Sequence, residues 1–209
     1  MTTLPEILVK HKGKTLDAAT IIAIVNEACT VPDLRLSVET VAPMPFRGFV
    51  FAVERYDDCL DELKGLHAAH WLETEKYRHS LPLDPDYLGF LRMEMAGQLL
   101  LFTIRKDGEL VGQSTMKLNR SMHSQTMVAH EDSLFLRADQ RGNAFVMLSF
   151  IKYGLGVMEG FGVREVRLSS KLINGADKLM VRAGFTPFAL QLVKMLGAAK
   201  HETETQVAA

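Results

Sequence analysis

Two neighbouring carboxylates and a glycine-containing turn are the parts of this sequence best suited to chemistry. Glu131 and Asp132 stand in an apolar run that leads into the turn, and a carboxylate there can take a proton from a substrate. Strand alternation places His130 and Asp132 on one face and Glu131 on the other. A solvated or ion-paired strand carboxylate is the alternative interpretation for each of the two acids.

The turn joins an apolar strand pattern, Ser133 to Leu136, to a helix pattern that starts at Ala144. The first N–H groups of a helix lack backbone partners and carry partial positive charge, so a turn containing Gly142 can hold a phosphate there. Many such turns bind nothing, and the order of the surrounding elements must decide between the two interpretations.

The chain before the turn is predicted to form a helix, a connector, and then strands and helices in a defined order. The helix covers 15–28, and three prolines break the stretch 31–47, which reads as a connector with room for one strand. Asp107-Gly108 predicts a hairpin between two of the later strands. One strand, two helices and three strands are expected at 49–55, 57–71, 87–96, 99–105, 110–118 and 126–136.

After the turn the pattern predicts a long helix, a strand, a short helix and one or two closing strands. These occupy 143–159, 164–170, 174–183 and 185–195, and the polar tail 197–209 is expected to be disordered. The predicted organisation is therefore an N-terminal helix and connector of unknown role (1–48), one α/β domain (49–196) and a flexible tail (197–209).

Composition favours a globular intracellular protein. Hydrophobic residues make up 47% and charged residues 23%, and the net charge of −1 gives no general reason to bind nucleic acid or an anionic membrane. Cys29 and Cys59 form no disulfide or metal-ligand spacing, so we expect free, buried thiols and no metal. No secretory signal is visible, and no apolar run approaches the ~20 residues that span a bilayer. A cytoplasmic location is expected.

Three stretches resemble motifs of the GNAT acyltransferase superfamily. Leu134 to Ala144 resembles its strand-plus-turn motif, in which an apolar strand end precedes an acidic-x-Arg-Gly step. Asn174 to Phe185 is similar to a later Asn-x-x-Ala…Gly-Phe segment, and Leu110-Val111-Gly112 matches the second hairpin strand. The resemblance covers 49–196 and implies an α/β (α+β) GNAT-like fold: a mixed, mostly antiparallel sheet flanked by helices, with an extra N-terminal helical segment.

A narrower resemblance is to GNAT-like proteins encoded by tailed bacteriophages. It rests on Ala69 to Glu75, Leu83 to Tyr87 and Asp132 to Leu136. It implies a location in the host cytoplasm or in a virion.

By the superfamily resemblance, acetyl-CoA is the co-substrate and lies where the strand ending at Leu136 diverges from the strand at 166–170. Pantetheine amides would pair with the free edge of the first strand, and the diphosphate would lie on N–H groups between Gln140 and Val146. The implied cofactor-binding residues are Leu134, Phe135, Leu136, Gln140, Arg141, Gly142, Asn143, Ala144, Val146 and Asn174.

Two departures from the superfamily pattern bear on this expectation. Where the pattern has two small residues after Arg-Gly, this chain has Ala144 and Val146, and a valine Cβ would crowd the phosphates in an unshifted turn. Met180 stands where many members carry a tyrosine that protonates the departing thiolate, so another group or solvent would have to serve.

The candidate catalytic residues are Glu131, Asp132 and Glu73. His70 and Glu73 are three residues apart on one predicted helix face and, with Trp71, could border an acceptor pocket.

The sequence therefore predicts an N-acetyltransferase that moves an acetyl group directly from acetyl-CoA to an amine on a protein or small molecule; a homodimer is compatible with the resemblance. The alternative is a GNAT-fold protein without catalysis, with a structural or host-protein-binding role, such as in a phage particle.

Overall fold

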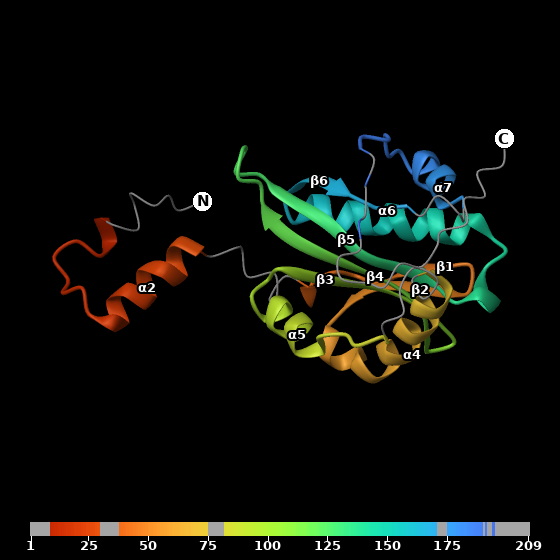
Figure 1. The fold of residues 1–209 in the computed structure, drawn as a ribbon, viewed down its shortest axis with the longest axis horizontal. Coiled ribbons are helices and arrows are strands. Elements are labelled where there is room, and N and C mark those ends of the chain that lie inside the picture. The colour runs from red at the N-terminus through yellow and green to blue at the C-terminus, as the bar shows by residue number, and fades with distance from the viewer. Residues whose placement is uncertain are drawn as a thin grey trace.

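Six strands form one sheet and follow one another across it in chain order (Figure 1). The computed structural model describes residues 9–29, 38–74, 82–170, 175–189, 191 and 194. The strands are β1 (Met44–Phe46), β2 (Phe49–Glu54), β3 (Leu99–Lys106), β4 (Glu109–Arg120), β5 (Met127–Leu136) and β6 (Val163–Arg167). Neighbouring strands from β1 to β5 are antiparallel, whereas β5 and β6 run parallel. The predicted mixed, mostly antiparallel sheet is confirmed.

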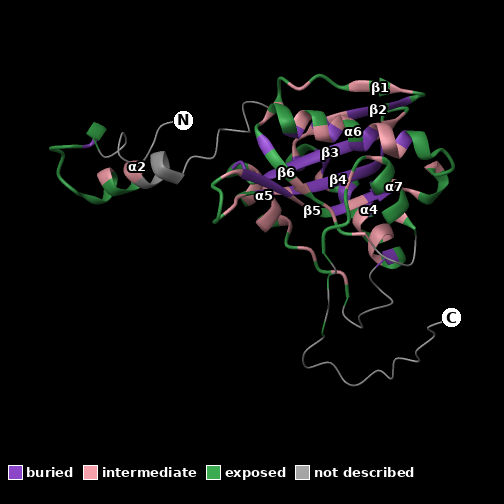
Figure 2. Ribbon diagram, turned by 90° about the horizontal axis from the view of Figure 1, so that it is seen from above, coloured by how far each residue is buried: buried purple, intermediate pink, exposed green. Residues whose placement is uncertain are grey.

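Helices cover both faces of the sheet (Figure 1). One face carries α4 (Tyr56–Thr74) and α5 (Tyr87–Met95), which bury Leu63 against Leu101 and Phe135. The other carries α6 (Ala144–Gly160), whose Phe150 packs edge-on against Phe51 with ring centroids 5.4 Å apart. Burial is concentrated on the central strands β3, β4 and β5 (Figure 2). A short helix, α7 (Ala176–Arg182), adjoins α6.

Local sequence explains several boundaries. Asp86 caps the start of α5, because its carboxylate accepts a hydrogen bond from Gly89 N–H at 2.8 Å. Asp107 and Gly108 have φ of +51° and +85°, the geometry of a two-residue hairpin turn, which confirms the Asp-Gly prediction. Asn143 caps α6 by accepting a hydrogen bond from Phe145 N–H at 3.0 Å.

The two ends of the sheet differ from the sequence prediction. β1 lies within the predicted connector, so the sheet starts before residue 49. The closing strand predicted within 185–195 is wrong over Phe185–Ala189, which pairs with no strand. Pro187 has no N–H group to donate to a ladder, which accounts for the difference. The tail at 197–209 lies outside the described residues.

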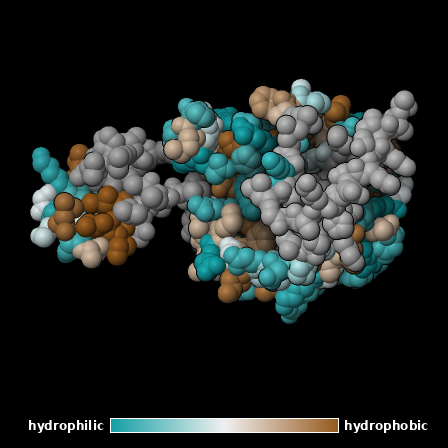
Figure 3. Space-filling model, in the orientation of Figure 1, coloured by the Kyte–Doolittle hydropathy of each residue, from teal (hydrophilic) through white to brown (hydrophobic). Residues whose placement is uncertain are grey.

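The N-terminal helix α2 (Ala18–Cys29) lies apart from the sheet (Figure 1). Its apolar side chains gather on an open surface (Figure 3), where Ile21 and Ile22 are 49% and 58% exposed.

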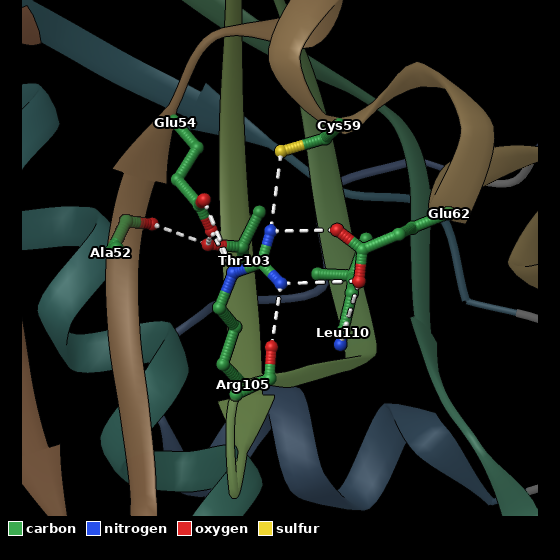
Figure 4. Close-up of polar contacts among 8 residues, drawn as sticks. Ala52, Glu54, Cys59, Glu62, Thr103, Arg105 and Leu110 are labelled. Carbon is green, nitrogen blue, oxygen red and sulfur yellow. Dashed lines mark hydrogen bonds and ion pairs between the residues drawn. The ribbon is translucent and has the colours of Figure 1, made fainter.

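An ion-pair network fixes α4 to the sheet (Figure 4). The Arg105 guanidinium on β3 donates to both Glu54 oxygens at 2.9 and 3.1 Å and to the Glu62 carboxylate of α4 at 2.9 and 3.1 Å. It also donates to Gly108 O at 2.8 Å and approaches the Cys59 Sγ at 3.7 Å. Burial raises the pKa of the Cys59 thiol to about 12, so this free, buried cysteine is a structural residue.

The network makes stability depend on pH through Glu62. Hydrogen bonds from Arg105 hold the pKa of Glu62 below its ordinary value of 4.5 in the folded protein. The stabilisation that ionised Glu62 contributes is therefore complete above pH 4.5 and is lost as the pH falls below that value. We expect the urea midpoint of the wild type to fall more steeply between about pH 5 and pH 3 than that of Glu62→Gln. Parallel slopes for the two proteins would contradict this.

Candidate functional site

The strands β5 and β6 diverge in the middle of β5. Their pairing ends at His130 and Arg167, whereas β5 continues to Leu136 on its other edge with β4. From Glu131 to Leu136, no strand in the described part of the chain pairs with the β6-side edge of β5. This leaves backbone N–H and C=O groups available to an extended ligand. Leu134 and Leu136 turn their side chains toward α6, and Phe135 turns toward α4.

The edge leads directly into a turn with free N–H groups. A 3₁₀ turn (Ala138–Gln140) is followed by Gly142, whose φ of +125° favours glycine strongly. Within the described residues, the N–H groups of Gly142, Asn143 and Ala144 have no hydrogen-bond partner. Three unpaired donors at the start of a 17-residue helix suit a phosphate.

Val146 lies beyond these donors and faces the core. It is 1% exposed, and its N–H donates to Asn143 O at 3.0 Å. Its Cβ therefore does not crowd the turn, and its backbone is already paired. The sequence alone could not decide this, because the direction of Val146 depends on where α6 begins.

The Arg141 side chain is turned toward α4. Its Nη1 and Nη2 donate to the two carboxylate oxygens of Glu73 at 2.6 and 2.9 Å, and its Nε donates to Leu136 O at 2.7 Å. The guanidinium also lies over the Phe135 ring, 5.2 Å from its centroid, and His70 stacks on the same ring. Two predicted site residues, Arg141 and Glu73, are thus brought into direct contact.

A β-bulge separates the two predicted strand acids. Thr115 pairs with Ser133 and Met116 with Glu131, so Asp132 has no partner on β4. The Asp132 carboxylate forms an ion pair with Lys117, whose Nζ lies 5.7 Å from the centroid of the Phe90 ring of α5. Asp132 therefore lies on the α4/α5 face of the sheet.

Glu131 is directed to the β6 side. Its carboxylate accepts hydrogen bonds from the N–H and the hydroxyl of Ser169, both at 3.1 Å. Glu131 therefore spans the point where β5 and β6 separate. Glu131 and Asp132 thus lie on opposite faces of β5, as the strand alternation predicts.

Ser170 is a site residue that the sequence reasoning did not single out. Its Oγ is buried and has no hydrogen-bond partner among the residues that the structure describes. It follows Ser169 at the divergence of β5 and β6, so it could donate to a polar ligand entering there. Ser169 and Ser170 stand together at the end of the predicted strand 164–170, and this pair is the sequence feature that could have indicated the site.

The remaining predicted cofactor residues are placed as follows. The Gln140 amide oxygen accepts a hydrogen bond from Lys106 Nζ at 2.9 Å, and its amide nitrogen donates to Asp139 at 2.8 Å. Asn174 lies outside the described residues. Met180, in α7, is 8% exposed and brings no ionisable proton.

A groove of about 530 Å³ opens between the end of α4 and α5. Trp71, Phe90 and Met93 are apolar residues of its lining, and Lys117, also in the lining, is paired with Asp132. Asp84 and Asp86 line it as well. The Asp86 carboxylate is occupied by its cap and by Arg92 at 3.8 Å, whereas Asp84 has no polar partner in the described part of the chain.

A second, smaller cavity lies on the α6 face where β5 and β6 separate. Its internal volume is about 30 Å³, and its walls include Leu134 of β5, Val166 of β6 and Leu155 of α6. Ser114 is its one hydroxyl-bearing wall residue.

Divergent parallel strands followed by a donor-rich turn at a helix start, on a mostly antiparallel sheet with helices on both faces, define a GNAT-like fold. No protein-family model matches this sequence, and no curated protein matches it significantly. Solved structures do match the fold.

One match is an aminoglycoside acetyltransferase from an uncultured soil metagenomic sample, with a TM-score of 0.56, 13% identity, and coverage of 73% of this chain and 97% of that one. A ribosomal-protein-alanine N-acetyltransferase from Brucella melitensis matches with a TM-score of 0.55 and 16% identity over 71% and 99%. A transcriptional regulator from Bacillus halodurans has a TM-score of 0.58 and 14% identity over 71% and 99%. At such identities the likeness concerns the fold.

The described residues contain no cluster of three or more histidine, cysteine, aspartate or glutamate side chains arranged for a metal ion. None of their helices has the length and apolar character needed to cross a bilayer.

Proposed function

We propose that this protein transfers an acetyl group from acetyl-CoA directly to an amine. One observation carries the proposal: the unpaired edge of β5 leads into a turn with three free N–H groups at the start of α6. The extended pantetheine arm of acetyl-CoA carries amides and ends in a diphosphate. Its amides are complementary to the unpaired backbone of β5, and its diphosphate is complementary to the N–H groups of the turn.

The bound acetyl-CoA would supply the activated acyl group, and the chain's own residues would hold it. The backbone edge from Leu134 to Leu136 would pair with the pantetheine amides, except at Leu136 O, which already accepts a hydrogen bond from Arg141 Nε. Gly142, Asn143 and Ala144 would donate to the diphosphate. Ser170 Oγ, which is buried without a partner, donates to the same arm. For Asn174, the proposed contact with acetyl-CoA rests on the superfamily resemblance alone.

The cavity beside Leu134 and Val166 has apolar walls that suit the methyl of an acetyl group. We therefore propose acetyl as the transferred group.

The acceptor amine enters by the groove between α4 and α5. Its ammonium form would be attracted to Asp84, and its body would pack on Trp71 and Phe90. Before attack the amine must lose a proton. Asp132 is the proposed acceptor of this proton, because its ion-pair partner Lys117 lines the groove. Glu131 is held by Ser169 and serves mainly to fix the divergence of the strands. Solvent protonates the departing thiolate, since Met180 cannot.

A second candidate function is a GNAT-fold binding protein without turnover, such as a structural or host-protein-binding component of a phage particle. The buried thioether of Met180 and the partners already held by Glu131, Asp132 and Glu73 favour it. Both candidates share the GNAT-like fold, and only the enzyme requires acetyl-CoA to bind.

The test is an acetyl-transfer assay with a panel of amines, combined with calorimetry of acetyl-CoA. Turnover that is lost in Asp132→Asn while acetyl-CoA affinity is kept supports the enzyme. Acetyl-CoA binding without turnover on any amine supports the binding protein. Absence of acetyl-CoA binding contradicts the enzyme.

A further inference from the structure

Each of the three nitrogens of the Arg141 guanidinium donates to a protein group. The acceptors are Glu73 Oε1, Glu73 Oε2 and Leu136 O, at 2.6, 2.9 and 2.7 Å. Both side chains of the ion pair are 41% exposed, so solvent and ions reach it. We call this contact the Arg141–Glu73 link.

A diphosphate at the turn would compete with Glu73 for Arg141. Arg141 directly precedes Gly142, whose free N–H begins the proposed phosphate site. A diphosphate carries more negative charge than one carboxylate and accepts paired hydrogen bonds from a guanidinium equally well. Exposed ion pairs are weak, so exchange of one anion for the other is accessible.

Glu73 also lies at the junction with the acceptor groove. It belongs to the last turn of α4, which ends at Thr74, and Trp71 in the same turn lines the groove. The Thr74 hydroxyl donates to His70 O at 2.9 Å, and His70 stacks on Phe135, so these residues move with the end of the helix. Loss of the link would therefore change both the charge and the packing at the groove.

We propose that the Arg141–Glu73 link is a regulatory contact that a bound diphosphate breaks, and that its release communicates cofactor binding to the acceptor groove. The inference rests on the proposed acetyl-CoA site. In the ligand-free protein the link holds the end of α4 against the turn. With the diphosphate on Arg141, the Glu73 carboxylate is released beside the groove, where it adds negative charge for an ammonium group. By linkage, an acceptor that binds to the released form strengthens cofactor binding by the same factor.

The first measurement is CoA affinity by calorimetry at low salt. Glu73→Gln removes the competing charge, so we expect CoA to bind about three- to tenfold more tightly than to the wild type. In an Arg141→Met background the same substitution should change the affinity less than twofold, because the competition has been removed. Glu109→Gln is the matched control: it removes a carboxylate paired to Arg137 near the same turn and leaves the link intact.

The second measurement uses Trp71, the single tryptophan of the chain. CoA should change its fluorescence in the wild type. Ligand-free Glu73→Gln should already show the CoA-bound emission, and ligand-free Glu109→Gln should not.

The outcomes separate the two proposals. CoA binding with equal affinity in the wild type and Glu73→Gln overturns the link and leaves the acetyl-CoA site standing. Weaker CoA binding in Glu73→Gln also overturns it, because that result means the ion pair supports the bound state. Failure of both proteins to bind CoA overturns the proposed function together with the link.

Discussion

Gly142→Val is expected to weaken acetyl-CoA binding at least tenfold while the domain stays folded. Gly142 has φ of +125°, and a β-branched residue in that region is strained by about 1–3 kcal/mol. No atom lies within 4 Å of the position where a Cβ would stand, so the substitution makes no clash with the core. The turn can relieve the strain only by changing its backbone, and that change misdirects the N–H groups of Asn143 and Ala144. Calorimetry of acetyl-CoA measures the loss.

Gly162→Val is the matched control for this experiment. Gly162 also has positive φ, +81°, with open space around its Cβ position, but it follows the C-terminal end of α6. That end is roughly 25 Å from the turn at 1.5 Å per residue. We expect a similar loss of thermal stability in the two variants and lost affinity only in Gly142→Val. Unchanged affinity in Gly142→Val would mean that the turn does not hold the diphosphate.

The largest stability effect is expected from Arg105→Met. The substitution removes the donor that joins Glu54 of β2 to Glu62 of α4 and leaves two partly buried carboxylates without their cation (Figure 4). Arg105 is 23% exposed, so water replaces its hydrogen bonds only in part. We expect the free energy of unfolding to fall by about 2–4 kcal/mol, measured by urea denaturation.

Two further variants test the cause of that loss. Arg167→Met breaks an ion pair with Glu165 in which the side chains are 51% and 48% exposed, and it should cost less than about 1 kcal/mol. Adding Glu62→Gln to Arg105→Met should recover part of the stability, because one unpaired charge is removed. Equal losses in the two arginine variants would contradict a special role for the network.

Much of the fold follows from local sequence, and the differences have physical causes. Helical periodicity located α6, and Asp107-Gly108 located the β3–β4 hairpin, because both depend on neighbouring residues. The stretch that forms β1 is predicted to be a connector with room for one strand, because prolines, among them Pro43 and Pro45, break it. As the edge strand of the sheet, it tolerates Pro45 on its exposed side, where a missing N–H donor has little consequence.

The candidate site was predictable where it is local and unpredictable where distant segments meet. The strand, the turn and Gly142 follow one another in the chain, so their pattern could be recognised. Arg141 and Glu73 are 68 residues apart, and no local pattern indicates that they pair. The small cavity and the acceptor groove likewise depend on how α4, α5 and α6 pack against the sheet.

The central claim is that the free N–H groups at the start of α6 bind the diphosphate of acetyl-CoA. Its most direct test is a titration of the ¹⁵N-labelled protein with CoA, followed through the backbone amide resonances. We predict saturable shifts, and slower hydrogen exchange, at Gly142, Asn143 and Ala144 that exceed those elsewhere on the sheet. Unchanged resonances for these three amides at saturating CoA would contradict the claim.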